Sequence, residues 1–230
     1  MLQGCEALES RAMLGKISRA ASFLSLIFNL RFQHGAHQIV DFVLSNPLIR
    51  PVQVPSELKR FAEIVASICP KKVLEIGTFQ GGTLCILARL SAPRATIISI
   101  DLPGGKFGGG QSKLRSLLYH TFGKSFQSMH LIRGDSHSEE VAARVRHIAQ
   151  SLDVLFIDGD HTYDGVKHDF LSYSPLVRPG GIVAFHDIAE HPMKAGGDVP
   201  RFWNEVKTSH RHEEIVENRE QGLGIGVLYL

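Results

Sequence analysis

The stretch Lys72–Thr83, with the sequence KVLEIGTFQGGT, constrains the fold of this chain more than any other. After Lys72 it has the apolar Val73 and Leu74, reaches Glu75 and Gly77, and passes through Gly81 and Gly82 into residues with helical apolar spacing. This order predicts a buried strand, a tight glycine turn and a helix. In an open parallel sheet, a ligand is expected just outside the carboxyl end of such a strand.

The same turn indicates which ligand is favoured. A dinucleotide fingerprint has a second glycine two residues after its first, so that the backbone can approach a pyrophosphate, and here Phe79 takes that position. Glu75 at the strand end would repel a pyrophosphate but attract the ammonium and sulfonium of S-adenosylmethionine. The stretch therefore favours that cofactor over NAD. Its candidate cofactor contacts are Glu75, Gly77, Thr78, Phe79, Gly81 and Thr83.

The rest of the chain predicts an α/β fold with a doubly wound, mostly parallel sheet. Strand and helix patterns alternate from residue 72 onward. Two final strands, expected at Glu213–Glu217 and Gly224–Leu230, are joined without a helix and should form an antiparallel pair. We expect residues 1–55 to form a helical N-terminal extension and residues 56–230 to form the cofactor-binding domain. Ser56 is the expected N-cap of a helix that runs to Ile68.

Acidic residues end the strands of the parallel part. Because the carboxyl ends of these strands meet in one crevice, the acids should gather there, and gathered like charges indicate cations among them. Asp101, next to Leu102, is placed to accept hydrogen bonds from ribose hydroxyls. Asp135 and Ser136 could reach an adenine, although side chains of such a turn often bond to their own backbone. Each acid taken alone could instead be a helix N-cap.

The densest chemistry lies at Asp158, His161, His186 and Asp187. Asp158 and Asp187 end strands that should be neighbours, so they could share a hard cation such as Mg²⁺, and Asp158 also borders the cofactor. His186 as a third ligand would favour Mn²⁺, but adjacent strand residues face opposite ways unless the strand has ended. His161, three residues after Asp158, suits the role of general base. The alternative for either histidine is a position away from the crevice.

Composition excludes some functions and leaves others open. The 25 basic and 23 acidic residues nearly balance, which gives no electrostatic basis for binding nucleic acid. Three scattered cysteines predict a reducing, cytoplasmic location. The apolar segment 20–32 is too short to span a membrane. We expect an amphipathic helix there that packs on the domain or a partner, as in a homo-oligomer, with peripheral membrane contact as the alternative.

Several motifs together resemble class I S-adenosylmethionine-dependent methyltransferases. The motifs are EIGTFQGGT, ISIDLPGG, RGDS, FIDGDHTYDGVKHDF and LVRPGGIVAFHD. They are most similar to the branch that contains macrolide-sugar O-methyltransferases and cephalosporin-hydroxylase-like proteins, over roughly residues 56–230. The resemblance implies a seven-stranded sheet with its last strand antiparallel and cofactor contacts at Glu75, Gly77, Asp101 and Asp135–Ser136.

The resemblance also implies a reaction. A divalent metal would be held by Asp158, His186 and Asp187, and His161 would be the base. Catechol-type relatives have an acid and an amide where this chain has His186 and Asp187. The expected function is methylation of a hydroxyl on a small acceptor, a sugar or a glycosylated natural product. The alternatives are a catalytically silent cofactor-binding module and a nicotinamide-dependent oxidoreductase.

Overall fold

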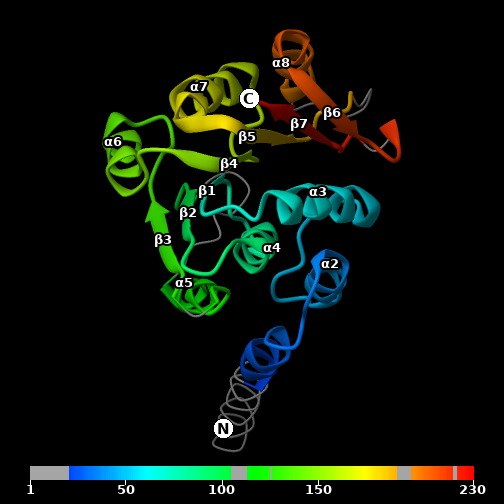
Figure 1. Cartoon of the computed structure of the whole chain (residues 1–230), viewed down its shortest axis with the longest axis vertical. Helices are drawn as coiled ribbons and strands as arrows, with labels where there is room; N and C mark the ends of the chain where they lie inside the picture. The colour runs from blue at the N-terminus through cyan, green and yellow to red at the C-terminus, as the bar shows by residue number, and fades with distance from the viewer. Residues whose placement is uncertain (1–20, 105–112, 125, 191–197, 220–221) are drawn as a thin grey trace, which may run out of the picture.

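The apolar runs form a seven-stranded sheet in the computed structural model, which describes residues 21–104, 113–124, 126–190, 198–219 and 222–230 (Figure 1). The sheet order is β3-β2-β1-β4-β5-β7-β6. Strands β1 to β5 pair in parallel, and β7 runs antiparallel to both β5 and β6. The predicted doubly wound sheet with an antiparallel edge is confirmed. The strands are β1 Lys72–Ile76, β2 Thr96–Asp101, β3 Ser128–Arg133, β4 Leu152–Ile157, β5 Val177–His186, β6 Arg211–Ile215 and β7 Ile225–Tyr229.

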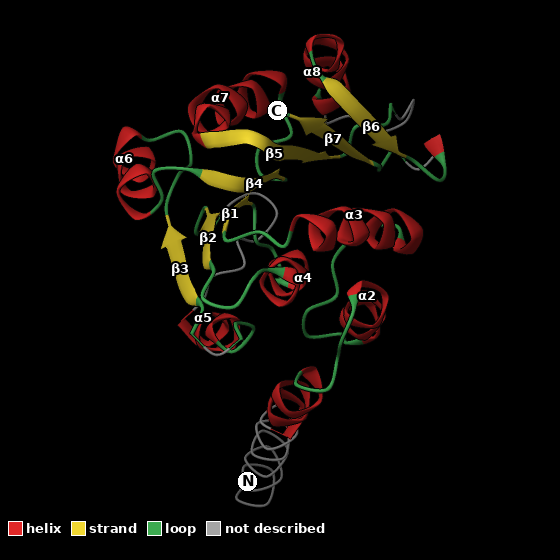
Figure 2. Ribbon diagram, in the orientation of Figure 1, coloured by secondary structure: helices red, strands yellow, loops and turns green. Residues whose placement is uncertain are grey.

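Helices cover both faces of this sheet (Figure 2). One face carries α2 (Ala36–Ser45), α3 (Pro55–Ile68), α4 (Gly82–Leu90) and α5 (Lys113–His120), which share a buried apolar cluster with it. The other face carries α6 (Glu139–Ile148), α7 (Tyr163–Tyr173) and α8 (Val199–Val206) around a second cluster. Strand order reverses between β1 and β4, so the crevice at their carboxyl ends is where a ligand is expected.

The described part of the predicted N-terminal extension is largely helical and joins the first cluster, whereas residues 1–20 of that extension lie outside the described residues. Residues 21–30 form a helix whose Leu26 and Leu30 are buried, whereas Leu24, Phe28 and Phe32 remain more than half exposed. The helix is therefore amphipathic and packed on the domain, but it also carries a second, exposed apolar stripe. In the described part of the chain, no helix is long and apolar enough to cross a membrane. Contact of this stripe with a membrane surface or another copy stays a prediction.

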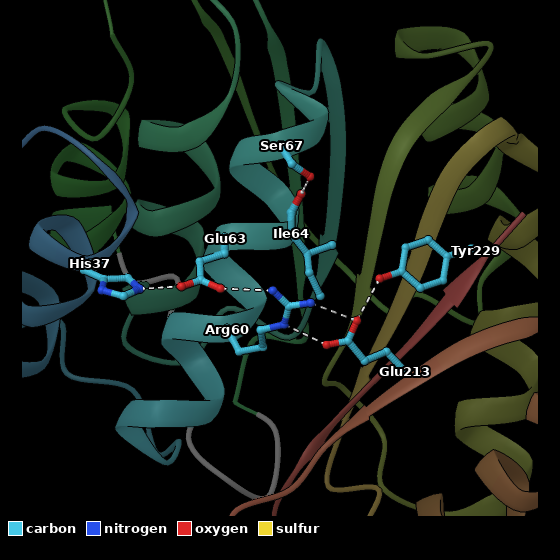
Figure 3. Close-up of polar contacts among 7 residues, drawn as sticks. All are labelled: His37, Arg60, Glu63, Ile64, Ser67, Glu213 and Tyr229. Carbon is cyan, nitrogen blue, oxygen red and sulfur yellow. Dashed lines mark hydrogen bonds and ion pairs between the residues drawn. The ribbon is translucent and has the colours of Figure 1, made fainter.

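Polar contacts of α3 connect the N-terminal helices to the antiparallel edge of the sheet (Figure 3). The Arg60 guanidinium lies between Glu63, at 3.1 Å, and Glu213 of β6, at 2.7 Å. Glu63 also contacts His37 of α2 at 2.7 Å, and the Tyr229 hydroxyl of β7 donates to Glu213 at 3.1 Å. Each exposed pair contributes little free energy, typically below ~1 kcal/mol. Together they link α2, α3, β6 and β7.

The start of α3 differs from the prediction. Val54 is the N-cap and Pro55 the first helical residue, so the prediction that Ser56 caps this helix is wrong. Proline suits the first helical position, where its missing N–H is not needed, and the helix therefore starts two residues earlier than predicted. The Ser56 hydroxyl instead donates to Glu217, near the end of β6.

Candidate active site

The turn after β1 has a backbone that explains its glycines. Gly77 and Gly81 have φ of 90° and 85°, values that favour glycine. A Cβ at Gly81 would stand 2.4 Å from the ring of Tyr119, so the position is closed to side chains. Phe79 is also left-handed, with φ of 45°, and the Tyr119 hydroxyl donates to its carbonyl oxygen at 2.9 Å. A strained non-glycine residue held in this way is a common feature of functional turns.

Glu75 is fully buried at the end of β1. The Ser99 hydroxyl donates to its Oε2 at 3.1 Å and also pairs with the hydroxyl of Thr78. The other oxygen, Oε1, has no hydrogen-bond partner in the described part of the chain. Burial, followed by the charges of Asp158 and Asp101, raises the pKa of Glu75 well above its usual value. A cation or a hydrogen-bond donor would satisfy this carboxylate.

The other predicted cofactor contacts lie along the same edge of the sheet. Asp101 ends β2 beside β1 and is only 8% exposed, while Leu102 after it is half exposed. The Asp135 carboxylate accepts a hydrogen bond from the backbone N–H of His137 at 2.9 Å and so stabilises the turn in which it lies. The carbonyl oxygen of Ser136 accepts the Tyr173 hydroxyl at 2.7 Å. Contact of this turn with an adenine stays a prediction.

Two acids and two histidines meet at the ends of β4 and β5. Strand β5 ends at His186, and Asp187 has φ of 60°, so the two neighbours do not alternate across the sheet. His186 Nδ1 lies 3.3 Å from Asp158 Oδ1 and 3.2 Å from Asp187 Oδ1. His161 Nε2 lies 3.5 Å from Asp158 Oδ1, and its Nδ1 lies 3.5 Å from Asp187 Oδ2. The structure thus brings together all four residues that the sequence singled out here.

Electrostatic contacts within this cluster shift the pKa values of Asp158 and of both histidines. Burial alone would raise the pKa of Asp158, but the charge of His186 and hydrogen bonds from both histidines outweigh it and lower that pKa. Burial opposes protonation of His186, yet Asp158 and Asp187 raise its pKa to about 9. The hydrogen bond with Asp158 likewise raises the pKa of His161 above its usual value. The two acids thus favour the protonated form of both imidazoles.

A metal ion fits part of this cluster. Ligand atoms of Asp158, His161 and Asp187 lie within 4.8 Å of one another. Asp187 Oδ1 is buried and receives no hydrogen bond from the described residues. Carboxylate oxygens suit Mg²⁺ and Mn²⁺, and an imidazole suits Mn²⁺ better. His186, predicted as the third ligand, faces the same two acids through Nδ1 and is only 5% exposed.

Sequence reasoning missed two residues that border the cluster. Gln53 Nε2 donates to Asp158 Oδ2 at 3.3 Å, and Gln53 Oε1 accepts the Thr83 hydroxyl at 3.1 Å. Glu57 of α3 is buried, accepts the backbone N–H of Glu217 at 2.8 Å, and its charge contributes to raising the pKa of His186. Gln53 lies in an irregular segment without a motif, and Glu57 looks like an ordinary first-turn acid. Only the tertiary fold brings both of them to the crevice.

Comparison with known proteins identifies the family. The sequence model of a methyltransferase domain matches residues 74–188, from β1 to just past the Asp158, His186 and Asp187 cluster. The chain belongs to this methyltransferase family. The predicted class I, S-adenosylmethionine-dependent methyltransferase is confirmed, which decides against the nicotinamide alternative.

Solved structures share the fold at low sequence identity. A putative O-methyltransferase from Klebsiella pneumoniae is 17% identical, with a TM-score of 0.60 over 84% of this chain and 89% of that one. The O-methyltransferase TomG from Streptomyces achromogenes, involved in tomaymycin synthesis and solved with S-adenosylmethionine, is 22% identical, with a TM-score of 0.56 over 85% and 87%. At this identity the likeness establishes the fold.

Curated relatives match over shorter stretches. The uncharacterized protein R132 of Acanthamoeba polyphaga mimivirus is 31% identical over 119 residues, which is 51% of this chain and 52% of that protein. The uncharacterized protein y4gI of Sinorhizobium fredii is 40% identical over 58 residues, 24% of this chain and 6% of that protein. The chain thus matches about half of the first relative and a small part of the second.

Proposed function

We propose that this methyltransferase transfers the methyl group of S-adenosylmethionine to a hydroxyl oxygen of a small acceptor, a sugar or a glycosylated natural product. The observation that carries the proposal is the juxtaposition of the turn after β1 with the cluster formed by Asp158, His161 and Asp187. A cofactor cradle and a group able to accept a proton from a hydroxyl thus share one crevice. O-methyltransferases among the similar folds, TomG included, support the choice of an oxygen acceptor.

The cofactor cradle fits a cationic nucleoside. The lack of a side chain at Gly77 lets the turn after β1 pack against the Asp158 backbone, and the Oε1 atom of Glu75 is without a partner in the described part of the chain. Glu75 would receive hydrogen bonds from the amino acid portion of the cofactor, and Asp101 would accept the ribose hydroxyls. When bound, the cofactor supplies an electrophilic methyl group.

The proton of the acceptor would go to His161. As the oxygen–methyl bond forms and the sulfur–methyl bond breaks, the acceptor hydroxyl must lose its proton, and an imidazole is a suitable base. Asp158 and Asp187 flank the two ring nitrogens of His161 and so orient the ring. They would also stabilise the imidazolium that results, in the way a buried acid supports a catalytic histidine.

We also propose a divalent metal, Mg²⁺ or Mn²⁺, held by Asp158 and Asp187. His186 completes the set in this assignment, which leaves His161 as the base. A bound ion would lower the pKa of an acceptor hydroxyl. The geometry equally suits His161 as a ligand, and substitution separates the two assignments. His161→Gln should abolish turnover and keep metal affinity, whereas His186→Gln should weaken metal binding.

Calorimetric titration with S-adenosylmethionine, with and without Mg²⁺, tests the proposal first. Asp101→Ala should abolish the binding seen in the natural sequence if the ribose lies at the end of β2. A screen of hydroxylated acceptors with added metals would follow, with S-adenosylhomocysteine formation as the readout. Absence of binding under both conditions would contradict the proposed cofactor site. Binding without turnover of any acceptor would favour the catalytically silent module instead.

A further inference from the structure

A cavity of about 780 Å³ opens beside the cofactor turn. Its walls come from three separate parts of the chain: the segment 47–55 before α3, Phe79 and Gln80 of the turn after β1, and Glu217, Asn218 and Leu223 between β6 and β7. Sites for small molecules commonly have volumes of about 300–1,000 Å³, so the cavity has the size of a binding site. Two of its three walls lie outside residues 74–188, the part that matches the methyltransferase domain.

Gln53 connects this cavity to the reacting groups. It lines the cavity, and its amide donates to Asp158 while accepting from Thr83 at the start of α4. The segment that carries Gln53 is pressed against the same helix start. A Cβ at Gly82 would stand 2.3 Å from the carbonyl oxygen of Ile49 and 2.6 Å from the ring of Pro51. The wall is therefore packed in place next to the cluster.

The lining indicates the kind of molecule that fits. It carries one cationic side chain, Arg50, and one anionic side chain, Glu217, so neither sign of charge predominates. Amide groups come from Gln53, Gln80 and Asn218. Apolar surface comes from Phe79, which is 39% exposed, and Val52, which is 66% exposed, together with prolines and Leu223. Amides suit hydroxyl groups, and a ring with its face open suits an apolar or sugar face.

We propose that this cavity is the acceptor site and that it selects uncharged molecules combining a polyol head with an apolar body. Phe79 and Val52 form the apolar wall. Gln53 is a positioning residue: it lines the cavity, and its hydrogen bond to Asp158 holds that carboxylate beside the bound acceptor. The proposal rests on the proposed methyl transfer, because it identifies the place from which the methylated hydroxyl would approach the cluster.

Saturation-transfer NMR can test the site with three probes that share an aryl ring. They are 4-nitrophenyl β-glucoside, which is neutral, 4-nitrophenyl phosphate, which is anionic, and 4-nitrobenzylamine, which is cationic. The filling variant is Val52→Trp, at an exposed position where a larger side chain costs no core packing. The matched control is Leu171→Trp on α7, which is 59% exposed and lies outside the cavity lining. Circular dichroism confirms the fold of each variant.

The glucoside should give the strongest transfer in the natural sequence and in Leu171→Trp. Transfer should fall roughly tenfold in Val52→Trp, because a loss of about 1.4 kcal/mol of binding free energy lowers the affinity for the probe by that factor. Equal transfer in Val52→Trp, stronger transfer from either charged probe, or none from all three would overturn the proposal. S-adenosylmethionine calorimetry on Val52→Trp should match the natural sequence. A failure of cofactor binding in the natural sequence would instead contradict the proposed function, whatever the probes show.

Discussion

Gly77 and Asp158 pack so closely that a Cβ atom at Gly77 would stand 2.0 Å from the Asp158 carbonyl oxygen. The contact joins the turn after β1 to the turn after β4, where strand order reverses. The contacting atoms belong to the backbone of Asp158, which cannot move aside as a flexible side chain could. The close approach therefore fixes the distance between the cofactor cradle and the cluster around Asp158.

Gly77→Ala should for this reason abolish cofactor binding and destabilise the fold by more than about 3 kcal/mol, through a backbone clash added to the strain of a positive φ. Gly35→Ala is the matched control, because Gly35 also has a positive φ, 83°, but no atom lies within 4 Å of its Cβ position. That control should show only the strain, about 1–3 kcal/mol. Urea unfolding measures both. Equal losses in the two variants would show that the clash relaxes.

Asp187→Asn should weaken Mn²⁺ binding roughly 100-fold or more. Substituting residues that only hydrogen-bond to a metal ligand already lowers metal affinity about 10–100-fold, and Asp187 is proposed as a ligand itself. The reason is the loss of one of the two carboxylates proposed to hold the metal. Electron paramagnetic resonance of free Mn²⁺ measures the affinity. Asp135→Asn is the control, because an asparagine oxygen can still accept the His137 N–H. Unchanged Mn²⁺ affinity in Asp187→Asn would remove the metal from the proposed mechanism.

Turnover should rise with pH through a point above the ordinary histidine pKa. A base must be unprotonated, and the hydrogen bond with Asp158 raises the pKa of His161. In Asp158→Asn the partner is neutral, so the rising limb of the profile should move to lower pH while the maximum rate falls. A profile of kcat against pH for both proteins, without added metal, checks this. An unmoved limb would show that another group limits the rate.

The parts of the site that follow from strand ends could be predicted from the sequence. Parallel strands deliver their last residues to one edge, so Glu75, Asp101 and Asp158 could be placed before the structure was known. His161 could be included because it closely follows Asp158. These positions depend on local patterns and on one rule of topology.

Other features depend on contacts between distant segments and could not be predicted. Gln53 is 105 positions from Asp158, in a segment whose path is set by packing against Gly82. The left-handed backbone of Asp187 lets the side chains of His186 and Asp187 join the same cluster. The residue type alone does not predict this backbone conformation, because most aspartates have a negative φ. The helix start at Pro55 reflects a competition between two acceptable N-caps, Val54 and Ser56, that lie two residues apart. In each case the outcome depends on tertiary packing or on a small free-energy difference between two local conformations.

A second buried acid, outside the cluster, gives a prediction about stability. Asp169 of α7 is fully buried, and His137 Nε2 lies 3.6 Å from its Oδ1. Burial, with smaller contributions from Asp160 and Asp135, raises its pKa to about 6, and the Ser136 hydroxyl and His137 counteract this only in part. The folded protein therefore holds this proton more tightly than the unfolded chain, whose aspartates titrate near pH 4.

Stability should consequently fall as pH rises between about 4 and 6, because in that window the folded state binds more protons than the unfolded state. Asp169→Asn removes the buried charge. It should be more stable than the natural sequence above pH 7, by up to about 3 kcal/mol for two pKa units, with the difference vanishing near pH 4. Asp164→Asn, at an exposed site on the same helix, should show no such trend. Urea unfolding at pH 4.5, 6 and 7.5 measures the three proteins. If Asp169→Asn were less stable at every pH, the ionised carboxylate would be a structural requirement and not a cost.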